Sequence, residues 1–347
     1  MSVIGSNVLA GASGASGDEY VVAIGHDGSP YISVYEWDSG FGTKYANPST
    51  ALPNRVEDIA FGPNGDYIAM ACIGSPFILV YSWSSSGFGS KYSNPSTLPS
   101  SSGNAIALSP DGSDIAIAHG SSPYISVYPF SSGFGTKYSN PSTLPGNTGR
   151  GVDFSPDGNN IAVGHQAYPY LNVYPWSSGF GSKYSDPSSP PSNIGRITKF
   201  SPDGNTLAIS HDNSPYIAAY PWSSGFGSKY SNPSTLPANS SGLAWHPDGD
   251  AIAAVHGGSP YITAYPWSSG FGTKYANPSS LPDDNARKVA FSPDGADVVV
   301  AHGKHYSTNN MVSAYPFSSA SGFGAKYSSP SSPPPENAFG VAFGTLS

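Results

Sequence analysis

The chain has 347 residues, a net charge of −8 and only 10% charged residues, together with 41 glycines and 34 prolines. So many helix-breaking residues exclude a mainly helical protein, and the acidic balance argues against nucleic acid as a partner. We expect neither a secretory signal nor a membrane-spanning segment, because no apolar stretch is long enough, and the single cysteine excludes an internal disulfide.

In chain order, residues 1–16 precede the first recognisable unit, and we expect a tail, an extra edge strand or a contact for self-assembly there. Residues 17–347 are expected to form one domain, because they repeat with a period of about 46 residues. The segment Gly-Phe-Gly-x-Lys-Tyr occurs seven times, with its phenylalanine at Phe41, Phe88, Phe134, Phe180, Phe226, Phe271 and Phe323. A period of this length indicates that each repeat is one supersecondary unit.

Each unit predicts four short β-strands, as residues 150–186 illustrate. A first strand at 151–154 ends in a Ser-Pro-Asp-Gly turn, and a second at 160–165 ends on His165. A third at 169–176 alternates with a period of two, and a fourth at 180–184 precedes an Asp-Pro pair. Because one small sheet buries too little surface to be stable alone, we expect the units to pack radially as blades of a β-propeller.

The two ends of the chain predict how the ring closes. Residues 338–344 repeat the register of a first strand but no blade follows them, whereas the first unit lacks a first strand of its own. The predicted fold is therefore an all-β, seven-bladed propeller with four antiparallel strands per blade, in which the C-terminal strand completes the first blade.

The repeat also resembles a known family. Phe-Ser-Pro-Asp-Gly, an apolar strand ending in His and Ser-Pro-Tyr-Ile resemble the WD40 or YVTN type of propeller. The fuller unit, closed by Asn-Pro-Ser-Thr-Leu-Pro, is similar to WD40-like repeat proteins of tailed bacteriophages and their hosts. This resemblance implies the propeller fold, and it implies a virion or surface setting. Propellers carry many unrelated activities, so it implies no particular reaction.

Histidine is the most regular candidate for chemistry. One histidine ends the second strand of six units, at His26, His119, His165, His211, His256 and His302, and Cys72 fills the same slot in the remaining unit. A ring of metal ligands would need these side chains within about 2 Å of a shared ion, which sevenfold geometry does not allow. We interpret them as one buried imidazole per blade, and we predict no metal site and no cofactor.

Candidate binding residues lie where the repeat is irregular or aromatic. The seventh unit enlarges the turn between its second and third strands, and the candidates there are Lys304, His305, Tyr306 and Asn309. Three third-strand tryptophans, Trp176, Trp222 and Trp267, are candidate platforms for stacking on sugars, although their repetition equally suits packing between blades.

These observations favour a binding or structural protein over an enzyme. We expect a non-enzymatic module of a phage virion or an extracellular surface that contacts other virion or surface proteins or glycans, with a cytoplasmic location left open. One alternative is a multivalent lectin with a weak sugar site on each blade. The other is a lactonase-like propeller enzyme, for which we find no irregular set of acid, arginine and histidine residues in the sequence.

Overall fold

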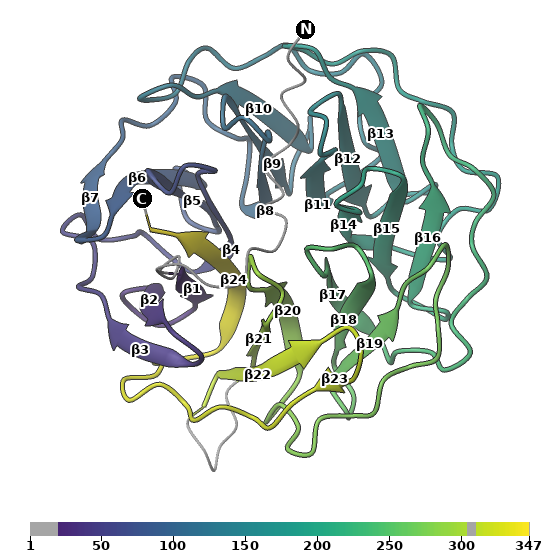
Figure 1. Cartoon of the computed structure of the whole chain (residues 1–347). Coiled ribbons are helices and arrows are strands. Elements are labelled where there is room, and N and C mark those ends of the chain that lie inside the picture. The colour runs from purple at the N-terminus through teal and green to yellow at the C-terminus, as the bar shows by residue number, and fades with distance from the viewer. Residues whose placement is uncertain (1–19, 304–309, 347) are drawn as a thin grey trace, which may run out of the picture.

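The computed structural model describes residues 20–303 and 310–346, which form a ring of seven antiparallel sheets (Figure 1). The predicted tail at residues 1–16 and the candidates Lys304, His305, Tyr306 and Asn309 lie outside the described residues. Within them there is no helix, and hence no helix that could cross a membrane. The prediction of an all-β, seven-bladed propeller is confirmed.

Two neighbouring blades have four complete strands. From the axis outward, the first blade consists of β24 (Ala338–Thr345), β1 (Tyr20–His26), β2 (Ile32–Trp37) and β3 (Phe41–Lys44). The second blade consists of β4 (Val56–Phe61), β5 (Tyr67–Cys72), β6 (Ile78–Ser84) and β7 (Gly87–Lys91).

The other five blades follow in chain order. The third has β8 (Gly103–Leu108), β9 (Asp114–His119) and β10 (Ile125–Pro129). The fourth has β11 (Gly149–Phe154), β12 (Asn160–His165) and β13 (Leu171–Pro175), and the fifth has β14 (Gly195–Phe200), β15 (Thr206–His211) and β16 (Ile217–Pro221). The sixth has β17 (Ser240–Trp245), β18 (Ala251–His256) and β19 (Ile262–Pro266), and the seventh has β20 (Ala286–Phe291), β21 (Asp297–His302), β22 (Val312–Ser318) and β23 (Gly322–Phe323).

Ring closure follows the prediction. Strand β24 pairs antiparallel with β1 along its whole length, from Tyr20 opposite Thr345 to His26 opposite Ala338. The last strand of the chain is thus the innermost strand of the first blade (Figure 1). The pairing of β24 with β1 therefore joins the two ends of the described chain in one sheet and closes the ring.

The fourth strand is shorter than predicted in five blades, and in the seventh blade it is the two-residue strand β23. In the third to sixth blades it is reduced to an isolated bridge, such as Trp176 opposite Phe180. The preceding strand ends there in proline, which has no N–H to donate to an outer neighbour. In the first two blades Glu36 and Ser82 occupy the proline position, and the outer strand is four or five residues long.

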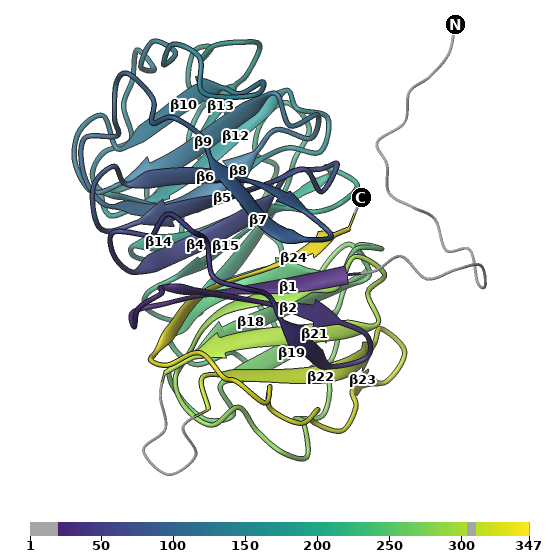
Figure 2. The ribbon, with the colours of Figure 1, turned by 90° about the vertical axis from the view of Figure 1, so that its left-hand side faces the viewer.

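The hydrophobic core lies between blades rather than within them. One cluster, for example, joins Ala116 and Val127 of the third blade to Val152, Ile161 and Tyr174 of the fourth. Figure 2 shows the sheets from the side, stacked face to face around the ring. Each blade therefore depends on both neighbours for burial of its apolar faces.

Buried tyrosines attach the connections between blades. The Tyr174 hydroxyl donates to the carbonyl of Thr143 at 2.9 Å, and Tyr220 makes the equivalent bond to Ser189 at 2.8 Å. Both acceptors lie in the Pro-Ser-rich segment that leads into the blade. Six of the seven third-strand tyrosines make this bond, whereas the buried hydroxyl of Tyr315 has no partner among the described residues. The bond is one reason for the repeated tyrosine, and packing between blades is the other.

Candidate functional site at the arginine-lined mouth of the channel

Every inner strand carries a β-bulge at its second residue. In the fourth blade Gly149 pairs with His165 and Gly151 with Gly164, so Arg150 has no partner in the ladder. The same register shift occurs near the start of the inner strand of each other blade. A bulge turns a side chain out of the regular alternation and is common beside functional sites.

The bulged residues differ from blade to blade and line one cavity. In ring order they are Phe339, Glu57, Asn104, Arg150, Arg196, Ser241 and Arg287. The cavity has a volume of about 540 Å³, which is within the range of small-molecule sites. We call it the mouth, because it lies at the beginning of the inner strands, at one end of the channel.

Buried histidines form the shell behind the mouth. Each pairs with the small first residue of an inner strand, as His119 does with Gly103. The imidazole Nε2 of His26 lies 3.1 Å from Ser33 Oγ, and its Nδ1 lies 2.7 Å from the carbonyl of Gly28. Burial lowers the pKa of His26 to about 4. Burial also lowers the pKa of the other five, so six blades each hold one separate, neutral imidazole and the second blade holds Cys72 instead.

The mouth concentrates positive charge in an acidic protein. All four arginines of the chain, Arg55, Arg150, Arg196 and Arg287, line this cavity. Lys288 is a fifth cationic lining residue, while Glu57 is the single carboxylate among the described lining residues. In a chain of net charge −8, this arrangement creates a local positive potential that attracts anions.

Two of the arginines are neutralised by carboxylates. Arg55 forms an ion pair with Glu57, with its Nε 2.8 Å from Glu57 Oε1. Arg196 binds both carboxylate oxygens of Asp212, one of them 3.1 Å from its Nη2. The bidentate pair of Arg196 holds its guanidinium in a defined orientation, while both donors of Arg55 share one oxygen of Glu57.

The other two arginines have no ion-pair partner in the described chain. Arg150 donates from Nε to the side-chain oxygen of Gln166 at 3.0 Å, in the amide orientation that satisfies both groups. The Nε of Arg287 is buried without a hydrogen-bond partner, and its guanidinium lies 4.2 Å from the ring centre of Phe339. Burial lowers the pKa of both arginines, because each is partly removed from water.

A second cavity of about 430 Å³ lies further along the inner strands. It contains two ion pairs, Lys288 with Asp58 at 3.0 Å and Lys199 with Asp153 at 2.8 Å. The second oxygen of Asp153 accepts the backbone N–H of Phe200 at 2.9 Å. Lys288 lines both cavities, so its pairing with Asp58 marks the boundary between them.

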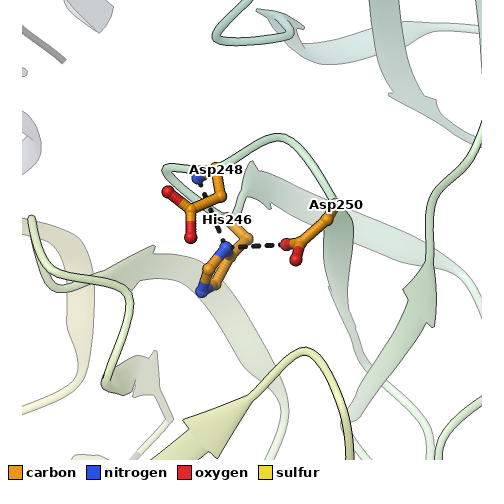
Figure 3. A group of neighbouring side chains, drawn as sticks. All are labelled: His246, Asp248 and Asp250. Atoms are coloured by element: carbon orange, nitrogen blue, oxygen red, sulfur yellow. Dashed lines mark hydrogen bonds and ion pairs between the residues drawn. The ribbon is translucent and has the colours of Figure 1, made fainter. Parts of the chain in front are cut away.

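A separate group of side chains has the spacing of metal ligands. His246, Asp248 and Asp250 offer ligand atoms within 4.8 Å of one another (Figure 3). His246 Nδ1 lies 2.8 Å from Asp250 Oδ1, and its Nε2 lies 3.2 Å from the carbonyl of Gly295 in the next blade. This histidine replaces the serine of the other Ser-Pro-Asp-Gly turns, so we interpret the group as a contact between blades.

The predicted tryptophan platforms lie largely inside the structure. Trp176 and Trp222 are each 5% exposed and pack edge-on against Phe180 and Phe226. The Trp176 Nε1 donates to Asp114 of the preceding blade at 3.0 Å. Trp267 is half-buried against Trp245 and Tyr230. Stacking on sugars stays an untested prediction for these residues, and all three lie away from the mouth, at the end of a third strand.

The residues of the mouth were missed in the sequence, although a signal was present. In a repeat whose second and third strands are nearly identical, the second position of the first strand changes among Arg, Ser, Asn, Glu and Phe. The sequence hid the importance of this position, because regular strand alternation gives no reason for its side chain to face the channel. Only the bulge directs all seven side chains into a common space.

Comparison with known proteins gives likeness of structure only. No protein-family model matches the sequence, and no curated protein matches it. Solved structures do match: a periplasmic gluconolactonase of Pseudomonas aeruginosa is 18% identical, with a TM-score of 0.70, and the match covers 94% of this chain and 99% of that one. Candidate 6-phosphogluconolactonases from Bacteroides fragilis and Bacteroides uniformis are 14% and 17% identical, with TM-scores of 0.70 and 0.67.

The match covers 94% of this chain and 98% of the Bacteroides fragilis protein, and 94% and 100% in the comparison with Bacteroides uniformis. At identities this low, the matches establish the shared propeller fold alone. The comparison also corrects our expectations about function and about the absence of enzyme activity. The expected non-enzymatic virion or glycan-binding module is wrong on this comparison, because the propellers that share the fold bear the names of enzymes. The lactonase alternative, for which we found no residue set in the sequence, is the better supported reading.

Proposed function

We propose that this protein is a lactonase-like hydrolase that opens a small anionic lactone at the mouth of its channel. One observation carries the proposal: all four arginines and a single carboxylate converge on a cavity of ligand size. The names of the structural neighbours support a lactone as the substrate. The electrostatics of the mouth support an anion.

Binding would use the guanidinium groups that lack carboxylate partners. Arg150 and Arg287 each present planar N–H donors, which suit carboxylate or phosphate oxygens. Arg55 is paired with Glu57 and lies 4.1 Å from the ring centre of Phe339, so its guanidinium is held in place and its charge is already compensated. An anionic group of the substrate would supply a counter-charge that the protein itself does not provide to Arg150 or Arg287.

Glu57 is the group in the mouth that can accept a proton. In the proposed reaction its carboxylate removes a proton from a water molecule as the water oxygen attacks the lactone carbonyl carbon. The oxyanion that forms would be stabilised by a neighbouring guanidinium. The ring C–O bond then breaks, and the departing alkoxide takes the proton from Glu57, which yields a hydroxy acid and restores the carboxylate.

A panel of small lactones with and without an anionic substituent tests this function, with acid release followed continuously. We expect hydrolysis of anionic members and a loss of about 10²- to 10⁴-fold in kcat/KM in Glu57→Gln, the usual range for a lost general base. Arg150→Asn is a conservative probe of binding, because Asn104 occupies the same position in the preceding blade. Lys229→Met, which removes a charge elsewhere on the ring, is the matched control and should leave activity unchanged. Full activity in Glu57→Gln, or no hydrolysis of any lactone, would reject the proposal.

A relationship to the WD40-like proteins of tailed bacteriophages is a separate proposal about origin. It rests on the repeat unit alone, and the genes that flank the coding sequence test it. Neighbouring tail or capsid genes would support it, and with it a virion or surface location.

A further inference from the structure

Some of the positive charges around the mouth are paired with carboxylates and others are not. Arg55 is compensated by Glu57 and Arg196 by Asp212, while Lys288 is compensated by Asp58. Arg150 and Arg287 have no carboxylate within ion-pair distance in residues 20–303 and 310–346. The mouth therefore retains two uncompensated positive charges rather than four.

These two charges lie on opposite sides of the channel. The inner strands follow one another around the axis in the order β24, β4, β8, β11, β14, β17 and β20 (Figure 1). Arg150 is on β11 and Arg287 is on β20, three positions apart, which is the largest separation that a ring of seven allows. The uncharged bulged residue Asn104 is the ring neighbour of Arg150, and the uncharged Ser241 is the ring neighbour of Arg287.

Each uncompensated arginine is held in place by a neutral neighbour. The guanidiniums of Arg287 and Arg55 lie 4.2 and 4.1 Å from the ring centre of Phe339, and the ring neighbour of both β20 and β4 is β24, which carries this phenylalanine. Arg150 is held by the amide of Gln166, and Asn104 of the adjacent blade donates to the carbonyl of Gly149 beside it at 2.7 Å. Both guanidiniums are thus positioned without being neutralised.

Partly buried, unpaired charges are costly, and a ligand that pairs them removes that cost. A ligand with one anionic group can neutralise one side of the mouth only. We infer that the natural ligand carries two anionic groups at its two ends, each a carboxylate or phosphate, which bind Arg150 and Arg287 across the channel. This inference uses the proposed substrate site but does not require that the ligand be hydrolysed.

Binding of unreactive compounds tests the inference independently of catalysis. The probes are straight-chain dicarboxylates from succinate to suberate and the monoamide of each, measured by isothermal titration calorimetry at low ionic strength. We expect each dicarboxylate that spans the mouth to bind at least about tenfold more tightly than its monoamide. Affinity should pass through a maximum at one chain length, because the two guanidiniums are held at a fixed separation.

Two variants identify the residues responsible. Arg150→Asn and Arg287→Ser introduce side chains that the fold already carries at this position, namely those of Asn104 and Ser241. Each should reduce the affinity for the best dicarboxylate to that for its monoamide and remove the discrimination. The matched control Lys229→Met should keep it. Equal binding of diacid and monoamide by the unaltered protein, or discrimination that survives in Arg150→Asn, would overturn the inference. Discrimination without hydrolysis of any lactone would refute the proposed enzyme but not the two-anion site.

Discussion

The buried histidines predict a loss of stability in mild acid. Burial lowers the pKa of His26, His119, His165 and His211 to about 4, from 6.5 in an unfolded chain. Between these two values the unfolded state binds a proton that the folded state excludes. Unfolding is therefore favoured as the pH falls from about 6.5 to about 4, and the effect saturates below that range.

The size of the effect follows from the two pKa values. Lowering the pH from 7.5 to 5.5 reduces the free energy of unfolding by ~1.3 kcal/mol for each such histidine, and by ~5 kcal/mol for four that titrate independently. Solvent screening does not reduce this figure much, because these side chains are at most 1% exposed. Carboxylates whose pKa is lowered in the folded state, such as Asp157, lose their contribution only at lower pH.

Urea unfolding at several pH values, followed by tryptophan fluorescence, measures this dependence. His211→Cys is the informative variant, because Cys72 already occupies the slot in the second blade. Ala218 also replaces the serine that contacts the imidazole in other blades, such as Ser33 beside His26, so no hydroxyl there loses a partner. The variant should lose ~1.3 kcal/mol less than the unaltered protein between pH 7.5 and 5.5. The reasoning is refuted if both proteins show the same pH dependence, or if the unaltered protein is as stable at pH 5.5 as at 7.5.

Two further predictions concern polar contacts in the channel and between blades. Lys199→Met leaves the Asp153 carboxylate unpaired. Because the lysine is 39% exposed, we expect a loss of about 1–2 kcal/mol in the free energy of unfolding, partly recovered by adding Asp153→Asn. Urea titration of the unaltered protein and the two variants would contradict this if the second change recovers nothing. Trp176→Phe removes the hydrogen bond to Asp114. The control is Trp83→Phe, because the Nε1 of Trp83 is equally buried but has no partner among the described residues. We expect the first change to reduce the free energy of unfolding by about 1 kcal/mol more than the second, and equal losses in thermal unfolding would show that the bond contributes nothing.

The candidate site illustrates how a repeat protein can acquire function without losing stability. The residues that pack between blades, such as Tyr174 and Ala162, are nearly the same in every unit because every interface is nearly the same. The bulged residue of each inner strand faces the channel and has no such constraint. Changes at this position alter the lining of the mouth while the interfaces between blades stay intact.

Local pattern alone determined the architecture. The period, the four strands per unit and the C-terminal closing strand are recorded in turn residues and in alternation along the chain, and each depends on short-range rules. The shortened fourth strand was also encoded, in Pro175 and its equivalents, since proline cannot donate to an outer neighbour.

Tertiary structure decided where the charge gathers. Arg55, Arg150, Arg196 and Arg287 are separated by up to 232 residues in sequence, and no local rule relates them. They share one cavity because ring closure places all seven inner strands around one axis. A bulge turns Arg150, Arg196 and Arg287 toward the mouth, and Arg55 directly precedes the inner strand β4. Pairing with Glu57 and Asp212 then leaves two of the four without a counter-charge, and that balance exists only in the folded ring.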